Sequence, residues 1–159
     1  MISWFGKGVL AAAIFLPVLS AGAGDAAQEQ PGKEQRGIEG VWDVSVTVRS
    51  CSTGAALFIG RVVLMFNDGG TLTEIADRAN RSAGLGTWRH LGGRSYTALE
   101  KFIDYNAAGG FSGTEIITRE IVLNKNADEY TAIATTEVYD AADHLIRTGC
   151  ATATATRFE

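Results

Sequence analysis

One glutamate and one arginine lie on apolar faces of two successive alternating segments. Glu100 shares a face with Phe102, and Arg119 belongs to the more apolar face of the next segment. If the turn at 106–110 places Glu100 opposite Ile117, Arg119 lies diagonal to Glu100 on the same face. We expect the two side chains to pair, because burying either charge alone is costly.

This pair has two interpretations. It is either a buried ion pair that fixes strand register, or a site at which Arg119 anchors an anionic or carbonyl-bearing ligand. A third outcome is a different assignment of faces, since both faces of these segments carry apolar residues. The side chains that we predict to contact a ligand are Tyr96, Glu100, Phe102, Arg119, Trp88 and Tyr130.

An alternative chemistry is proton transfer without a cofactor. Glu100 or Glu74 would act as a general base, while Arg119 and Tyr96 polarise a substrate carbonyl. Glu74 shares a face with Leu72, but the opposite face is also partly apolar, and the favoured interpretation is a solvent-exposed glutamate.

Metal and cofactor chemistry have no motif in this sequence. HExxH, CxxC, P-loop and GxSxG patterns are absent, and the two histidines, His90 and His144, are isolated. They do not predict a zinc site. We therefore expect no metal and no cofactor.

The segments that position these residues alternate like strands, with turn chemistry between them. Runs such as Asn67–Gly70 and Asn106–Gly110 supply the positive φ values that tight turns require. The pattern predicts an eight-stranded antiparallel up-and-down β-barrel in an all-β fold. The expected strands are Val41–Cys51, Leu57–Phe66, Thr71–Ala76, Gly86–Leu91, Arg94–Tyr105, Ser112–Asn124, Tyr130–Asp140 and Ile146–Phe158.

The two cysteines indicate how the barrel closes. Cys51 ends the first expected strand and Cys150 begins the last, and in an exported chain they favour a disulfide. If they face each other across an antiparallel pair, Val44 faces Arg157 and Trp42 lies diagonal to Arg157. We take both pairs to mark the same, closed end of the barrel, so that a ligand enters from the other end.

The residues Gly40-x-Trp42 on the first strand and Arg157 on the last resemble the pattern of calycin-like, lipocalin-like barrels. The segment from Ile38 to Glu159 also resembles small exported bacterial calycin-like proteins of unsettled function. The resemblance implies that Arg157 covers Trp42 and closes one end of the barrel, so both residues are predicted to be structural.

Alternation places alanines inside on the last two strands. Because an eight-stranded barrel can hold one small ligand, small walls favour a cavity, unless Trp88, Tyr96 and Phe102 fill it. The irregular segment Asp77–Leu85 is expected to be a mobile loop that gates one mouth.

The N-terminal residues belong outside the barrel. Residues 1–23 read as a signal peptide without a lipid-anchor cysteine, 24–37 as a disordered tether, and 38–159 as the barrel domain. Cleavage removes one positive charge and changes the net charge from −4 to −5. This acidity argues against nucleic-acid binding. We expect a secreted or periplasmic protein with no membrane span.

These observations favour a binding protein for an apolar or amphipathic small molecule, with the site inside the barrel. The alternatives are a cofactor-free barrel isomerase or cyclase and a ligandless structural or interaction domain, for which Ile133 and Tyr139 would offer an apolar outer patch. Ligand identity, protein partners and oligomeric state are not specified.

Overall fold

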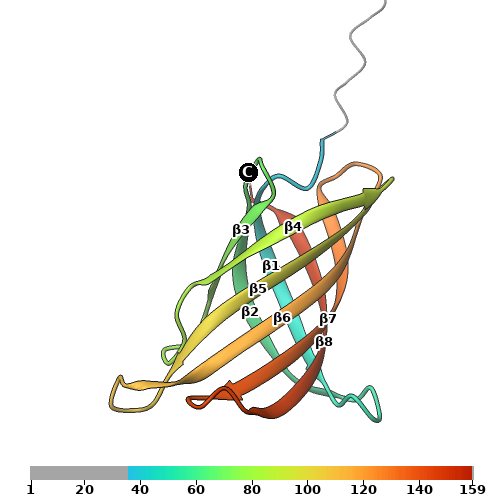
Figure 1. The fold of residues 1–159 in the computed structure, drawn as a ribbon. Coiled ribbons are helices and arrows are strands. Elements are labelled where there is room, and N and C mark those ends of the chain that lie inside the picture. The colour runs from blue at the N-terminus through green and yellow to red at the C-terminus, as the bar shows by residue number, and fades with distance from the viewer. Residues whose placement is uncertain (1–35, 159) are drawn as a thin grey trace, which may run out of the picture. The chain divides into compact units, whose positions relative to one another are not determined.

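The structure is a computed structural model that describes residues 36–158; the expected signal peptide and all but the last two residues of the expected tether lie outside this range. The described residues form one closed antiparallel barrel of eight strands paired in chain order (Figure 1). The predicted fold class is confirmed. The strands are β1 (Gly40–Arg49), β2 (Ala56–Phe66), β3 (Thr71–Ala76), β4 (Gly84–Gly92), β5 (Ser95–Tyr105), β6 (Phe111–Leu123), β7 (Glu129–Asp140) and β8 (Leu145–Arg157).

The first and last strands pair as expected, but their register differs from the prediction by two residues. Trp42 lies directly opposite Arg157, and Val44 lies opposite Ala155. The prediction failed because it placed Cys51 on the strand, whereas β1 ends at Arg49 and Cys51 lies in the turn that follows. A shift of two residues preserves the faces, so the alanines of β8 still point inward as predicted, alongside the buried Trp42 and Val44 of β1.

Arg157 closes one end of the barrel. Its guanidinium carbon lies 4.3 Å from the centre of the Trp42 ring, and Nη2 donates to the carbonyl of Gly37 at 2.8 Å. Trp42 Nε1 donates to the carbonyl of Ile38 at 2.8 Å, and both side chains are fully buried. Gly40 has φ +122°, and a Cβ there would lie 2.7 Å from Arg157 Nη1. The glycine of the GxW motif is therefore needed for this close approach.

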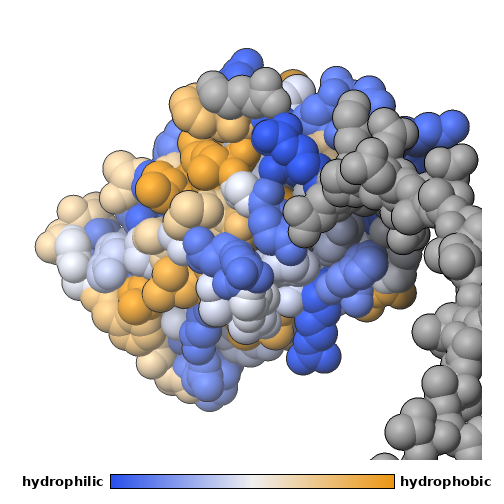
Figure 2. Space-filling view, turned by 90° about the horizontal axis from the view of Figure 1, so that it is seen from above, coloured by the Kyte–Doolittle hydropathy of each residue, from blue (hydrophilic) through white to orange (hydrophobic). Residues whose placement is uncertain are grey.

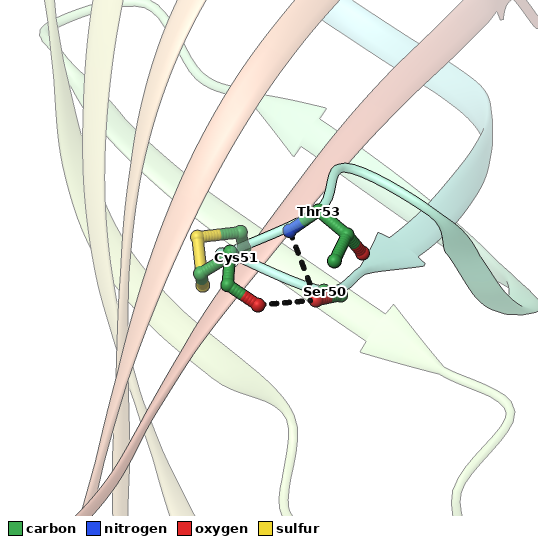
Figure 3. Close-up of a disulfide and its surroundings, with 5 residues drawn as sticks. Ser50, Cys51 and Thr53 are labelled. Carbon is green, nitrogen blue, oxygen red and sulfur yellow. Dashed lines mark hydrogen bonds between the residues drawn. A yellow bond between two sulfur atoms is a disulfide. The ribbon is translucent and has the colours of Figure 1, made fainter.

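The disulfide Cys51–Cys150 forms as predicted, with a Cα–Cα distance of 5.2 Å. It lies beside the turn in which the backbone N–H of Thr53 donates to the Ser50 hydroxyl (Figure 3). Our expectation that it marks the same end as Trp42 is wrong. Trp42 is near the start of β1 and Cys51 is beyond its end, so about ten residues of strand separate the closed end from the disulfide end.

Aromatic side chains fill the half of the lumen next to Trp42. Ring centres lie 4.9 Å apart for Trp42 and Tyr130, 6.2 Å for Phe66 and Trp88, and 5.9 Å for Trp88 and Tyr96. These are tilted and edge-to-face contacts of the kind that stabilise aromatic clusters. Leu72 on β3, Ile121 on β6 and Ala155 on β8, together with Leu64 on β2, complete this core.

The outer wall carries apolar side chains as well. Seen from the end that carries the C-terminus, the surface mixes hydrophobic and hydrophilic residues (Figure 2). Ile133 is well exposed, and the partly exposed Tyr139 donates its hydroxyl to Glu137. Val63, Ile75 and Leu85 are exposed on three neighbouring strands. The surface required by the interaction-domain alternative is thus accessible.

Among residues 36–158 there is no helix long and apolar enough to cross a membrane. The disulfide fits an oxidising compartment outside the cytoplasm.

Candidate functional site

Glutamates and arginines alternate in a connected series inside the other half of the lumen. Arg119 on β6 pairs with Glu100 on β5 through Nη1 and Oε1, and its Nη2 lies 2.5 Å from Oε2 of Glu74 on β3. The register places Arg119 opposite Ala98, diagonal to Glu100, as predicted. Each of these three side chains is at most 4% exposed. Burial of these charges is tolerated because each has a partner of opposite sign.

Arg81 continues the series toward the mouth of the barrel. Its Nη2 lies 2.9 Å from Glu74 Oε1, and its Nη1 lies 3.0 Å from Oε2 of Glu115 on β6. The same Glu115 oxygen is 3.5 Å from Nη1 of Arg78, whose side chain is 40% exposed. The series therefore runs from a fully buried carboxylate to the solvent.

The loop between β3 and β4 delivers Arg81 to the interior. The loop follows the end of β5: the backbone N–H of Ser82 donates to the carbonyl of Ile103 at 2.9 Å, and that of Tyr105 donates to the carbonyl of Asn80 at 2.8 Å. The Arg81 guanidinium carbon lies 3.4 Å from the centre of the Phe102 ring. Burial lowers the pKa of Arg81, and the carboxylates of Glu115 and Glu74 oppose that effect.

Two glycines on β4 make room for this arrangement. A Cβ at Gly84 would collide with the Phe102 ring, and one at Gly86 would collide with the backbone of Leu99 and Glu100. Gly86 pairs with Glu100 on β5, and Gly84 lies against the Phe102 ring from the same strand. Larger residues there would displace the ring under Arg81 or the carboxylate behind Arg119.

A cavity of about 90 Å³ lies between this series and the opposite wall of the barrel. The wall comes from β1, β2, β7 and β8, and the side chains that give it an apolar character include Val46, Val48, Val62, Ala134, Ala151 and Ala153. Among the described residues, the charged lining consists of three carboxylates and three guanidinium groups, from Glu74, Asp77, Glu115, Arg78, Arg81 and Arg119. The cavity thus has one apolar and one polar side.

Of the residues predicted to contact a ligand, Arg119 lines this cavity. Glu100 lies behind Arg119, and Phe102 lies beneath Arg81. Trp88, Tyr96 and Tyr130 belong to the aromatic half. The structure therefore brings Glu100, Arg119 and Phe102 together, and it separates the three other aromatic residues from the cavity. Their role in binding stays a prediction.

Glu74 corrects an expectation. It was expected to be exposed to solvent, yet it is 1% exposed and faces inward with Leu72. Its burial is possible because Arg81 and Arg119 each bind one of its oxygens. Alternation places Glu74 on the same face as Leu72, but the sequence does not show that an arginine from a loop neutralises its charge.

Sequence reasoning missed Arg81, Arg78 and Glu115. Glu115 had an available signal, because it is in phase with Ile117 and Arg119 on the same face of its strand. Arg81 and Arg78 had none, since residues in a loop follow no period that assigns them a side.

The histidines contribute nothing to the cavity. His90 stacks on Tyr96 with ring centres 4.7 Å apart at the closed end, and the exposed His144 lies beside Asp140 in a turn. Within residues 36–158 no group of three or more His, Cys, Asp or Glu side chains is arranged to hold a metal ion.

No protein-family model matches this chain, and no curated protein matches it in sequence. The closed eight-stranded antiparallel barrel is consistent with a calycin-like fold. The fold and site together define a barrel with one closed end and one two-sided internal cavity.

Proposed function

We propose that this chain is an exported binding protein that holds a small amphipathic molecule inside the barrel. The observation that carries the proposal is the cavity with its apolar wall of valines and alanines and its opposite wall of ion-paired side chains. Binding sites of this kind combine a mostly apolar lining with a few polar groups that orient the ligand.

The volume limits the ligand. About 90 Å³ is several times the roughly 10–15 Å³ that one water requires, and far below the roughly 300 Å³ at which typical ligand pockets begin. The ligand is either short or enters with one end only. The aromatic packing and the Trp42–Arg157 contact leave the disulfide end as the entrance.

The carboxylates support binding better than proton abstraction. Glu74 is held by two guanidinium groups, and Glu100 lies behind Arg119 rather than in the lining. A general base must reach the proton that it removes.

Native mass spectrometry of the protein purified from its own host tests the proposal, together with a variant that fills the cavity. Ala134→Phe places a ring in the apolar wall, whereas Ala142→Phe, in the exposed turn after β7, is the matched control. We expect a small molecule to accompany the wild-type and control proteins and to be missing from Ala134→Phe. The proposal fails if the wild-type protein carries no molecule and takes up no added short amphiphile, or if Ala134→Phe binds as well as the control.

A further inference from the structure

The charge balance of the cavity restricts the chemistry of its ligand. Among the described residues, the lining offers as many carboxylates as guanidinium groups, and Glu100 adds a further buried carboxylate directly behind Arg119. The interior therefore has no surplus of positive charge. From this balance we propose, building on the function proposed above, that the ligand is uncharged and presents a hydrogen-bond acceptor, such as an amide, ester or hydroxyl oxygen.

A carboxylate ligand finds no unpaired guanidinium group in the buried part of this cavity. The remaining lining arginine, Arg78, is 40% exposed to solvent and lies 3.5 Å from Glu115. Both terminal nitrogens of Arg119 are used, one by Glu74 and one by Glu100. Those of Arg81 are used by Glu74 and Glu115. An entering anion would have to displace one of these carboxylates or remain a buried charge without a partner, and either outcome costs free energy.

Arg81, which lines the cavity, has one buried donor, Nε, that has no hydrogen-bond partner among the described residues. This N–H can only be satisfied by an acceptor, because a guanidinium group accepts no hydrogen bonds. A ligand oxygen would satisfy it, whereas the ammonium group of an amine would not. The polar end of the ligand is thus an acceptor without charge.

A series of six-carbon compounds tests this inference at neutral pH. Hexanamide and hexanoate have nearly the same shape and differ in charge, 1-hexanol offers a smaller uncharged group, and hexylamine offers a cation. Titration of the full chain, followed by NMR chemical shifts of cavity methyl groups, gives each dissociation constant. We expect hexanamide to bind about tenfold or more tightly than hexanoate and than hexylamine, because only the amide enters without an uncompensated charge.

Variants that remove a carboxylate from the cavity lining should weaken the preference for hexanamide over hexanoate. Glu115→Gln removes a carboxylate from between Arg81 and Arg78, so it should raise the affinity for hexanoate and reduce or reverse the difference from hexanamide. Glu120→Gln, on the exposed face of the same strand, is the control and should leave the difference unchanged. Asp77→Asn is a second variant, because this exposed lining carboxylate can be neutralised without disturbing a buried ion pair.

The outcomes separate the two proposals. If none of the four compounds binds and no molecule accompanies the wild-type protein from its host, the proposed function itself fails. If none binds but a molecule does accompany the protein, a charged molecule overturns the restriction to uncharged ligands and an uncharged one supports it. If hexanoate or hexylamine binds as tightly as hexanamide while Ala134→Phe still excludes all of them, the barrel binds amphiphiles but the restriction to uncharged ligands is wrong. The same conclusion follows if neither Glu115→Gln nor Asp77→Asn moves the preference toward hexanoate.

Discussion

The two halves of the lumen solve the same problem of filling a barrel in different ways. Toward Trp42 the inward side chains are large, apolar and in mutual contact. Toward the disulfide the inward side chains are apolar and mostly small on one side and charged on the other, and a cavity remains between them. The comparison indicates that the first half provides stability and that the second provides a site, since a cavity and buried charges both reduce the packing energy available to the fold.

The largest effect is expected in the aromatic half. Trp42→Ala should lower the free energy of unfolding by about 3–5 kcal/mol, because Trp42 is fully buried and contacts both Tyr130 and Arg157. Val46→Ala, whose side chain lines the cavity, should cost clearly less. Urea denaturation of both variants measures the difference, and equal losses would remove the distinction between the halves.

The second-largest effect is expected for Arg119, which binds two buried glutamates at the centre of the charged series. Arg119→Met should lower the free energy of unfolding by about 3 kcal/mol or more, since it leaves Glu74 with one partner and Glu100 with none. Arg78→Met should cost less than about 1 kcal/mol, because the Arg78 side chain is 40% exposed. A similar loss in both variants, measured by thermal unfolding, would show that the buried pairs behave like surface pairs.

The Cys51–Cys150 disulfide covalently links the turn after the first strand to the last strand, in the half of the barrel that contains the cavity. Replacing both cysteines with serine should lower the free energy of unfolding by about 2–4 kcal/mol without changing the fold, because the bond restricts the unfolded chain. Calorimetry measures the loss, and circular dichroism at low temperature checks the fold. Two free thiols in the mature, exported protein would contradict the bond.

The smallest effect at neutral pH should come from Tyr130, which belongs to the aromatic half and is near enough to Arg119 to feel its charge. Its buried hydroxyl has no hydrogen-bond partner among the described residues, so Tyr130→Phe should change the free energy of unfolding by less than about 1 kcal/mol. Double-mutant comparison with Trp42→Ala would separate this hydroxyl from the ring contacts. A loss above about 2 kcal/mol would indicate a partner such as bound water.

The same residue predicts a change at alkaline pH. Burial raises the pKa of Tyr130 above its ordinary value of 10, and the nearby Arg119 opposes this shift only in part. Because the folded pKa is the higher one, the protonated hydroxyl contributes stability below pH 10 that is lost as the pH rises further. Between about pH 8 and about pH 11 the wild-type protein should therefore lose more stability than Tyr130→Phe. Equal losses of stability in the two proteins would contradict the raised pKa of Tyr130.

The sequence predicted the fold well because its main signals are local. Alternation, turn residues and the paired ends indicated a closed barrel, and the Glu100–Arg119 pair followed from one turn and one register. The register of β1 with β8 was wrong by two residues because strand ends are set by hydrogen bonds that alternation does not reveal.

Only the part of the site that lies on strands could be predicted from the sequence. Glu100 and Arg119 lie on regular strands, so alternation along each strand assigns their side chains to the inner face. Arg81 lies in a loop that pairs with the end of β5, and this pairing depends on backbone contacts between segments about twenty residues apart. Arg81 is one of the two arginines that make the burial of Glu74 possible, and it is one of the three arginines that balance the three lining carboxylates. The sequence alone therefore predicted neither the burial of Glu74 nor this balance.

The bond between Cys51 and Cys150 has a further consequence for the integrity of the chain. It joins residues 99 positions apart, and the loops 77–83, 106–110 and 141–144 all fall inside that interval. A protease that cuts any of them leaves both fragments in one covalent molecule. The bond also lies beside the β1–β8 seam, the pairing with the largest separation along the chain. Cleavage at one of these loops therefore leaves the turn after β1 joined to β8, next to the pairing whose loop is the longest and most costly in entropy to close.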